Sequence, residues 1–216
     1  MDRQNQKYLY GIFILAVIIR IASLLYNEAY LDLDPYWYSQ SRNAIILGLS
    51  DIGRAPLSPE IEAYYGTTVE SAKLVWPLMD RGLVFTHLLL KGVFGQTSYL
   101  ALQITQLLID SFLVFIVAVI GNRLGGSKAA LVAGLAYAVF VPQIWISTMP
   151  EYNTWLTFTY ILLTWLMFVF VESFQRKDYR RILLAGLGIA VTGFIGSQMR
   201  SIAILAPLGL AGWDWF

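Results

Sequence analysis

Cysteine is absent from this 216-residue chain, and histidine occurs only once, at position 87. Without thiols the chain forms no disulfide, no zinc–thiolate site and no cysteine nucleophile. A single histidine also excludes a metal site built from several histidines of this chain. Charged residues are scarce, at 13%, and the net charge of +1 gives no indication of nucleic acid as a partner.

Apolar residues take the place of the charged ones. They make up 57% of the chain, and the mean hydropathy is +0.61. A soluble domain of this size could not cover so much apolar surface. The composition therefore predicts an integral membrane protein.

Long apolar stretches predict the transmembrane helices. The first, Tyr8–Tyr26, is interrupted by Arg20 and is followed by no small-residue cleavage site, which favours an uncleaved helix over a signal peptide. Further spans are expected at Tyr99–Ile120, Ala129–Trp145 and Asn153–Val171, with a short fifth at Ile182–Ile195 and a sixth at Ser201–Trp213 that contains Pro207. We expect an all-α integral membrane fold with about five to six transmembrane helices.

The region 27–97, between the first two spans, is the long polar part of the chain. Eight acids and four basic residues fall within Asn27–Arg81, and a loop of this length is usually functional or disordered. Its aromatic residues, such as Tyr64 and Trp76, favour an ordered structure. Gly82–Gly95 is too short to span and carries His87 and Lys91 on one face, which predicts an interfacial helix.

The distribution of basic residues predicts the orientation. They fall in the N-terminal tail and in the short loops after the second and fourth spans: Arg3, Lys7, Arg123, Lys128, Arg176, Lys177, Arg180 and Arg181. The positive-inside rule places these segments in the cytoplasm. The chain is then a multi-pass protein of the cytoplasmic membrane or an endomembrane, with region 27–97 and the turn Ser147–Tyr152 facing outward.

Two carboxylates precede a predicted helix in Asp32-Leu33-Asp34-Pro35. Pro35 suits the first position of a helix, with Asp34 as its N-cap, and Trp37, Ala44 and Leu47 then recur at roughly helical spacing. Capping lowers the pKa of a carboxyl, which suits a group that binds a metal or orients an acceptor. Local pattern leaves both interpretations of Asp34 open, a helix cap and a functional carboxylate.

Other polar residues are expected on the same outer side. Glu151 and Arg200 would join Asp32 and Asp34 there. Acids from two loops can hold a divalent cation through oxygen ligands or activate a hydroxyl or amide nucleophile. The alternative for Glu151, which follows Pro150, is a cap of the fourth helix.

Two ionisable residues lie inside neighbouring spans. Arg20 and Asp110 are costly in hydrocarbon unless each faces a partner or a wet cavity. We predict a buried Arg20–Asp110 pair that fixes the packing of the first two spans. A proton relay is the alternative, although a relay normally needs more than one isolated pair.

The order of these features resembles the GT-C membrane glycosyltransferases. Asp32-Leu33-Asp34-Pro35-Tyr36-Trp37-Tyr38 looks like the acidic signature of that family's first outer loop, in the Asp-Pro-aromatic form of oligosaccharyltransferase catalytic subunits. The stretches HLLLKGVFGQTSYLALQ and LLIDSFLVFIVAVIGNRLGGSKAALVAGLAYAVFVPQ look like its second and third helices. GLGIAVTGFIGSQMRSIAILAPLGL is similar to the arginine-containing region of the lipid-phosphate-sugar branch, with Arg200 at the matching position.

The resemblance implies a function. It implies transfer of a sugar, with inversion and outside the cytoplasm, from a polyprenyl-phosphate or -diphosphate donor to an unknown acceptor. Asp34 and Asp32 would be catalytic, and Arg200, Glu151 and Tyr38 would bind substrate. The resemblance also implies a divalent cation on Asp34 and Glu151, although with fewer ligands. The second outer loop of an oligosaccharyltransferase carries a further acidic motif, whereas here Glu151 is a single acid.

The resemblance also bears on domain organisation. The family's later spans and any soluble C-terminal domain have no counterpart, so residues 1–216 are expected to be a single transmembrane module, the N-terminal part of a larger GT-C fold. The alternative function is a non-catalytic membrane subunit or assembly partner that keeps the GT-C shape. A small transporter is a third class, but the spans lack its paired broken helices.

Overall fold

The computed structural model describes residues 3–28, 39–75, 81–150 and 153–199. This part of the chain contains helices and no strand. The helices are α1 (Arg3–Glu28), α2 (Ser39–Leu49), α3 (Pro59–Tyr65), α4 (Val69–Val75), α5 (Arg81–Phe94), α6 (Tyr99–Ala138), α7 (Val141–Thr148), α8 (Asn153–Gln175) and α9 (Tyr179–Met199). The predicted all-α class is confirmed for these residues.

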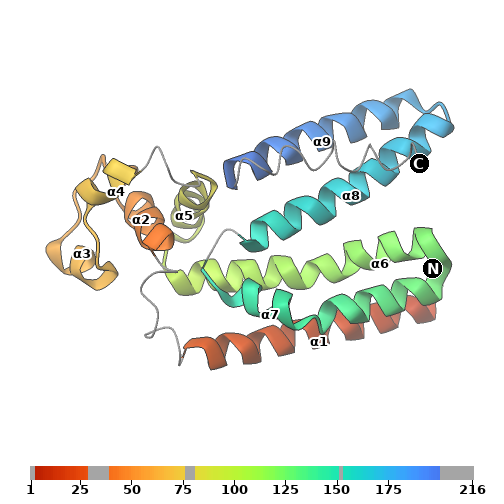
Figure 1. The fold of residues 1–216 in the computed structure, drawn as a ribbon, viewed down its shortest axis with the longest axis horizontal. Coiled ribbons are helices and arrows are strands. Elements are labelled where there is room, and N and C mark those ends of the chain that lie inside the picture. Colours follow the sequence, from red (N-terminus) through yellow and green to blue (C-terminus); the bar gives the residue numbers. More distant parts are fainter. Residues whose placement is uncertain (1–2, 29–38, 76–80, 151–152, 200–216) are drawn as a thin grey trace.

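The long helices form an elongated bundle, and α2 to α5 gather at one end of it (Figure 1). Four helices are long and apolar enough to cross a membrane: they lie in Asn5–Tyr26, Tyr99–Ala138, Asn153–Gln175 and Tyr179–Gln198. Many large apolar side chains on them are exposed, as a lipid-facing surface requires. These features support a membrane protein. The predicted sixth span, Ser201–Trp213, lies outside the described residues.

Helix α6 reverses direction partway along its length (Figure 1). Gly125 and Gly126 have non-helical backbone angles, and Gly126 has a φ of 74°, which a side chain would strain. The arms 99–124 and 127–138 then pack closely, because a Cβ on Gly121 would lie 2.9 Å from the carbonyl oxygen of Ala129. The first arm corresponds to the predicted second span.

The predicted third span, Ala129–Trp145, is wrong as a single helix. The returning arm of α6 ends at Ala138, Phe140 is extended, and α7 begins at Val141. Pro142 supplies the physical reason: a continuous helix would need its backbone N–H to bond the Ala138 carbonyl, and proline has none. The predicted fourth span agrees with α8, and α9 is longer than the predicted fifth span, Ile182–Ile195.

The predicted polar region 27–97 contains α2 to α5. Ser58 caps α3, which begins at Pro59 and ends before Gly66 in the left-handed conformation, so these residues set the two ends of that helix. Ala44 and Leu47 on α2 are fully buried in the core of this part. Whether that helix starts at Asp34-Pro35 cannot be compared, since those residues lie outside the described ones.

Helix α5 confirms the helix predicted at Gly82–Gly95, and it packs closely against α2. A Cβ on Gly48 would lie 2.5 Å from the Cβ of His87, so the two helices approach where glycine leaves room. Lys91 donates to the Leu49 carbonyl at 2.7 Å and forms an ion pair with Asp51 at 2.8 Å. His87 and Lys91 therefore share a face, as predicted, but that face contacts protein.

The basic loops gather at the end of the bundle opposite α2 to α5. The start of α1, the reversal of α6 and the turn between α8 and α9 all lie there (Figure 1). Arg123 bridges two of these elements through an ion pair with Glu172 at 3.0 Å. These loops thus lie at one end of the bundle, while the topology across a membrane stays a prediction.

Candidate functional site

The residues to which the sequence assigns chemistry lie outside the described part of the chain. They are Asp32, Asp34, Tyr38, Glu151 and Arg200. Their contacts, and the divalent cation expected on Asp34 and Glu151, therefore remain predictions. In the part of the chain that the structure describes, no group of three or more His, Cys, Asp or Glu side chains could hold a metal ion.

The described helix ends that flank these residues do converge. Helix α1 ends at Glu28, α2 begins at Ser39, α8 begins at Asn153 and α9 ends at Met199. All four of these ends lie at the α2–α5 end of the bundle (Figure 1). The described helix ends that come before or after the predicted site residues thus lie at one end of the bundle, opposite the basic loops.

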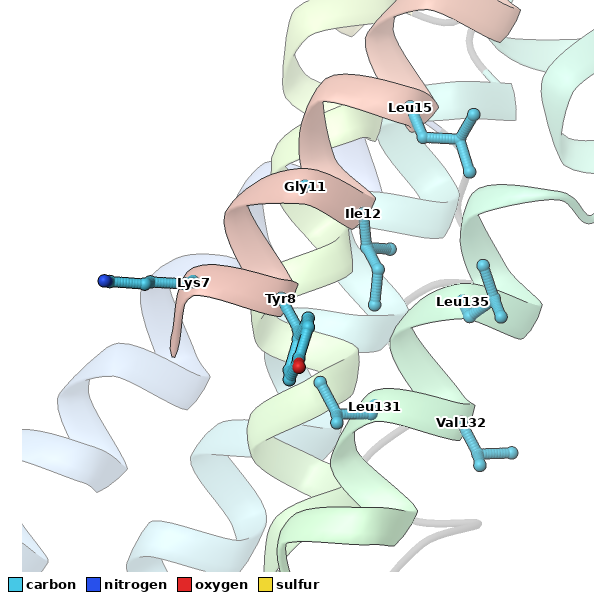
Figure 2. Close-up of a pocket in the computed structure, with 8 residues that line it drawn as sticks. All are labelled: Lys7, Tyr8, Gly11, Ile12, Leu15, Leu131, Val132 and Leu135. Carbon is cyan, nitrogen blue, oxygen red and sulfur yellow. The ribbon is translucent and has the colours of Figure 1, made fainter. Parts of the chain in front are cut away.

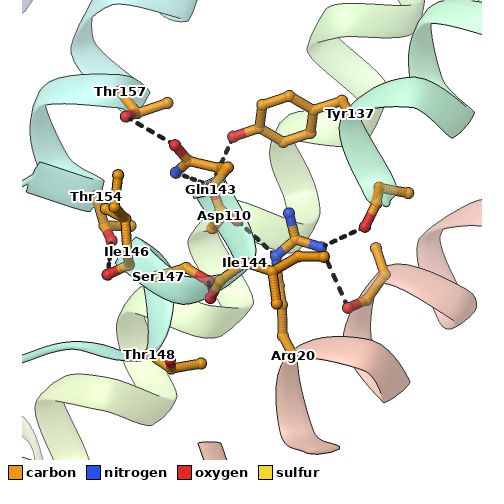
Figure 3. A network of polar contacts seen from close by, with 12 residues as sticks. Arg20, Asp110, Tyr137, Gln143, Ile144, Ile146, Ser147, Thr148, Thr154 and Thr157 are labelled. Atoms are coloured by element: carbon orange, nitrogen blue, oxygen red, sulfur yellow. Dashed lines mark hydrogen bonds and ion pairs between the residues drawn. The ribbon is translucent and has the colours of Figure 1, made fainter. Parts of the chain in front are cut away.

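The main polar cluster among the described residues is a network that joins α1, α6, α7 and α8 (Figure 3). Arg20 of α1 donates through Nε to the Asp110 carboxylate of α6 at 2.5 Å, and both side chains are fully buried. The predicted Arg20–Asp110 pair is confirmed. Sequence reasoning identified it because two isolated charges in neighbouring spans must find partners.

Arg20 also satisfies backbone carbonyls. Its Nη1 donates to Ala16 at 3.3 Å and to Ala138 at 3.1 Å. The Ala138 carbonyl is the one that Pro142 leaves without a helical donor, so Arg20 completes the broken hydrogen-bond ladder between α6 and α7. This role was not predicted, because it depends on where the third span breaks.

Two further side chains converge on the Asp110 carboxylate. Tyr137 donates to its Oδ1 at 2.6 Å and Gln143 at 2.7 Å. Gln143 in turn accepts from Thr157 of α8 at 3.2 Å. The network therefore joins α1, both arms of α6, α7 and α8, and it includes two residues that the sequence analysis did not select. The presence of a glutamine and a tyrosine within predicted apolar spans was the feature of the sequence that could have indicated further members of the network.

A second set of contacts holds the turn that precedes Glu151. Gln103 of α6 donates to the Thr148 carbonyl at 2.8 Å, and Thr154 of α8 donates to the Ile146 carbonyl at 3.3 Å. The hydroxyls of Ser23 and Thr148 lie 3.5 Å apart. Residues on three other helices thus position the end of α7.

The contacts of this network hold the helices against one another. Asp110 and Arg20 are fully buried, and the Asp110 carboxylate accepts side-chain hydrogen bonds from α1, α6 and α7. A proton relay normally needs more than one isolated pair, whereas these contacts join helices to one another. The arrangement therefore favours the structural interpretation of the pair over the relay.

His87 is the other buried ionisable group of note. Its Nδ1 lies 2.9 Å from the Thr97 hydroxyl, and the side chain is fully buried between α5 and α2. Burial lowers the pKa of His87 to about 4, because the charged imidazolium loses its hydration. The ring is therefore neutral at pH 7 and acts as a hydrogen-bonding core residue.

Comparison with known proteins assigns no function to these residues. Comparisons with protein-family models, with curated proteins and with solved structures find no match to this chain. The resemblance to GT-C glycosyltransferases accordingly depends on the residues of the chain itself, above all on the acidic stretch from Asp32 to Tyr38.

Proposed function

We propose that the chain is a membrane glycosyltransferase, or the N-terminal module of one, that transfers a sugar from a polyprenyl-phosphate or -diphosphate donor outside the cytoplasm. The observation that carries the proposal is the convergence of the helix ends flanking Asp34, Glu151 and Arg200 at one end of the bundle. This convergence supports the proposal that two acids and an arginine, far apart in the sequence, act on a common side. The basic loops occupy the opposite end, as an extracytoplasmic site requires.

A lipid-linked donor suits this architecture. The described residues form membrane-crossing helices and small packed helices, with no nucleotide-binding sheet among them. A polyprenyl tail brings the sugar phosphate to the membrane surface, where the small helices α2 to α5 meet the bundle. The donor then needs no soluble nucleotide-sugar domain in this part of the chain.

The proposed chemistry divides among the predicted residues. Asp34 orients or deprotonates the acceptor, whose nucleophile attacks the anomeric carbon from the face opposite the phosphate, so that the configuration inverts. Arg200 stabilises the departing phosphate by charge-assisted hydrogen bonds, and Asp32, Tyr38 and Glu151 bind substrate beside it. If Asp34 and Glu151 hold a divalent cation, their carboxylate oxygens are suitable ligands.

Asp34→Asn tests the catalytic role. Asparagine caps a helix about as well as aspartate, so folding should survive the change, while a role in proton transfer or cation binding is lost. We expect sugar release from a radiolabelled polyprenyl-phosphate donor to fall by at least about 100-fold, the contribution typical of a general base. The measurement uses the full chain in detergent or vesicles.

Matched variants separate this result from a general loss of charge. Asp32→Asn removes the neighbouring acid, and Glu60→Gln removes an exposed acid of α3; Glu60→Gln should retain full activity. Full activity of Asp34→Asn would leave only the helix-cap interpretation of that residue. A wild-type chain that binds donor and transfers no sugar would favour the alternative, a non-catalytic membrane subunit.

A further inference from the structure

An apolar groove runs along the membrane-spanning surface between α1 and the returning arm of α6 (Figure 2). Its volume is about 430 Å³, and its walls include Tyr8 and Leu15 of α1 and Leu131 and Leu135 of the arm. Both walls belong to segments long and apolar enough to cross a membrane. The groove therefore opens toward hydrocarbon.

Gly11 deepens the groove on the α1 side. A Cβ placed on this residue would meet no atom within 4 Å, so the missing side chain leaves space that the protein does not fill. From Lys7 to Leu15 the groove extends over eight residues of helix, about 12 Å at 1.5 Å per residue. This length suits a stretch of one extended hydrocarbon chain.

The polar end of the groove is basic. The stem of Lys7 lines it, and the amine points away from the apolar walls (Figure 2), as lysine does where hydrocarbon meets water. Lys128 is exposed and lies one helical turn before Leu131 and Val132, on the same face of the arm. No acidic residue is among those that line the groove.

We propose that this groove binds an anionic phospholipid, with one acyl chain along Gly11 and the phosphate near Lys7 and Lys128. The apolar walls take the chain, and two cations without an acid select a negative headgroup over a zwitterionic one. A second copy of the chain fits less well, because a symmetric contact at this surface would bring like-charged lysines together. The proposal does not depend on glycosyl transfer.

Native mass spectrometry of the detergent-purified full chain tests the proposal, with dioleoyl-phosphatidylglycerol and dioleoyl-phosphatidylcholine as probes. We expect tighter retention of the anionic lipid by the wild type. Gly11→Leu adds a side chain whose Cβ meets no protein atom within 4 Å and whose remaining atoms occupy groove space, so it should abolish that preference. Lys7→Gln should weaken binding of the anionic lipid about fivefold, the effect of one basic residue near a charged headgroup.

Two controls keep the changes specific. Gly92→Leu adds the same side chain to α5 at a position that is exposed, as Gly11 is, and where a Cβ also meets no atom within 4 Å. Arg180→Gln removes an exposed positive charge at the same end of the bundle. Both should bind lipid as the wild type does, and Gly11→Leu should keep the wild-type melting temperature.

The proposal is overturned by any of three results. The first is unchanged lipid preference in Gly11→Leu, which would place the lipid elsewhere. The second is an equal loss in Arg180→Gln and Lys7→Gln, which would indicate general charge attraction. The third is a wild-type dimer that Gly11→Leu converts to a monomer, which would make the groove a contact between copies.

Discussion

At the scale of single residues, Asp110 has the most consequential side chain among the described positions. Its two carboxylate oxygens accept hydrogen bonds from Arg20, Tyr137 and Gln143. These donors come from α1, the returning arm of α6 and α7. Removal of this carboxylate therefore leaves a buried cation, a buried amide and a half-buried phenol hydroxyl without their acceptor.

We predict that Asp110→Ala lowers the free energy of unfolding by about 3–5 kcal/mol, the cost of leaving one member of a buried ion pair alone. The double variant Arg20→Leu/Asp110→Leu should recover part of this loss. Recovery is incomplete because Tyr137 and Gln143 still lack their acceptor. The measurement is thermal unfolding in detergent of Asp110→Ala, of the double variant, and of its two single changes, Arg20→Leu and Asp110→Leu.

The neighbouring Ser111→Ala is the matched control for that series. The Ser111 hydroxyl is buried and has no hydrogen-bond partner among the described residues, so its removal should be neutral or stabilising. A double variant as unstable as the two single losses added together would mean that Arg20 and Asp110 are energetically independent. The packing role assigned to the pair would then be wrong.

At the scale of helices, α5 is fastened to α2 by a close contact that includes one titratable group. His87 is fully buried, and its pKa is lowered from 6.5 to about 4 by burial. The unfolded chain therefore binds a proton between these two values while the folded chain does not. Folding must lose stability as pH falls from about 6.5 to about 4, and the loss from this group ends below pH 4.

We predict that wild-type stability decreases by about 2 kcal/mol between pH 7 and pH 5 from His87 alone. His87→Asn keeps a polar atom near the position of Nδ1, which contacts Thr97, and cannot titrate. It should therefore lose much less stability over the same pH range. Unfolding by urea at both pH values measures the difference, and an equal pH dependence in the two proteins would show that His87 contributes nothing.

At the scale of the whole molecule, the short helices and the basic loops lie at opposite ends of the bundle. The small helices α2 to α5 lie at one end, and the loops with Arg123, Lys128 and Arg180 lie at the other (Figure 1). This separation gives the positive-inside rule a geometric basis in the fold. It predicts that the small helices face away from the cytoplasm.

Single cysteines test this orientation in a chain that has none of its own. We predict that Glu60→Cys on α3 reacts with a membrane-impermeant maleimide in intact cells, because that residue is exposed and the predicted orientation puts α3 outside the cytoplasm. Arg180→Cys, equally exposed at the opposite end, should react only after permeabilisation. The reverse pattern would contradict the orientation and the proposed extracytoplasmic chemistry together.

Much of the fold could be predicted because membrane-spanning segments are recognisable from short stretches of sequence. A run of apolar residues long enough to cross hydrocarbon must be helical, since no water satisfies its backbone there. Spans one, two and four were accordingly found near their observed positions. The Arg20–Asp110 pair was found for the same reason, because hydrocarbon tolerates neither charge alone.

The candidate site was less accessible to prediction. Gln143 and Tyr137 are uncharged, so their presence in apolar spans carried little signal until α7 and the returning arm of α6 brought them to Asp110. The break before α7 was missed as well, although Pro142 stood in the sequence, because the third span is apolar on both sides of it. The contacts of Asp34, Glu151 and Arg200 remain predictions.

The sequence by itself determined the membrane class, the helical fold, the acidic stretch before α2 and the need for Arg20 and Asp110 to meet. Each of these depends on composition or on the free-energy cost of placing a polar or charged group in hydrocarbon. That cost is the same whichever way the helices pack. Tertiary structure decided which carbonyl Arg20 completes, that Gln143 carries the network to α8, and that Lys7 and Gly11 border a groove. Those outcomes depend on distances between residues far apart in the chain, which only the packed helices define.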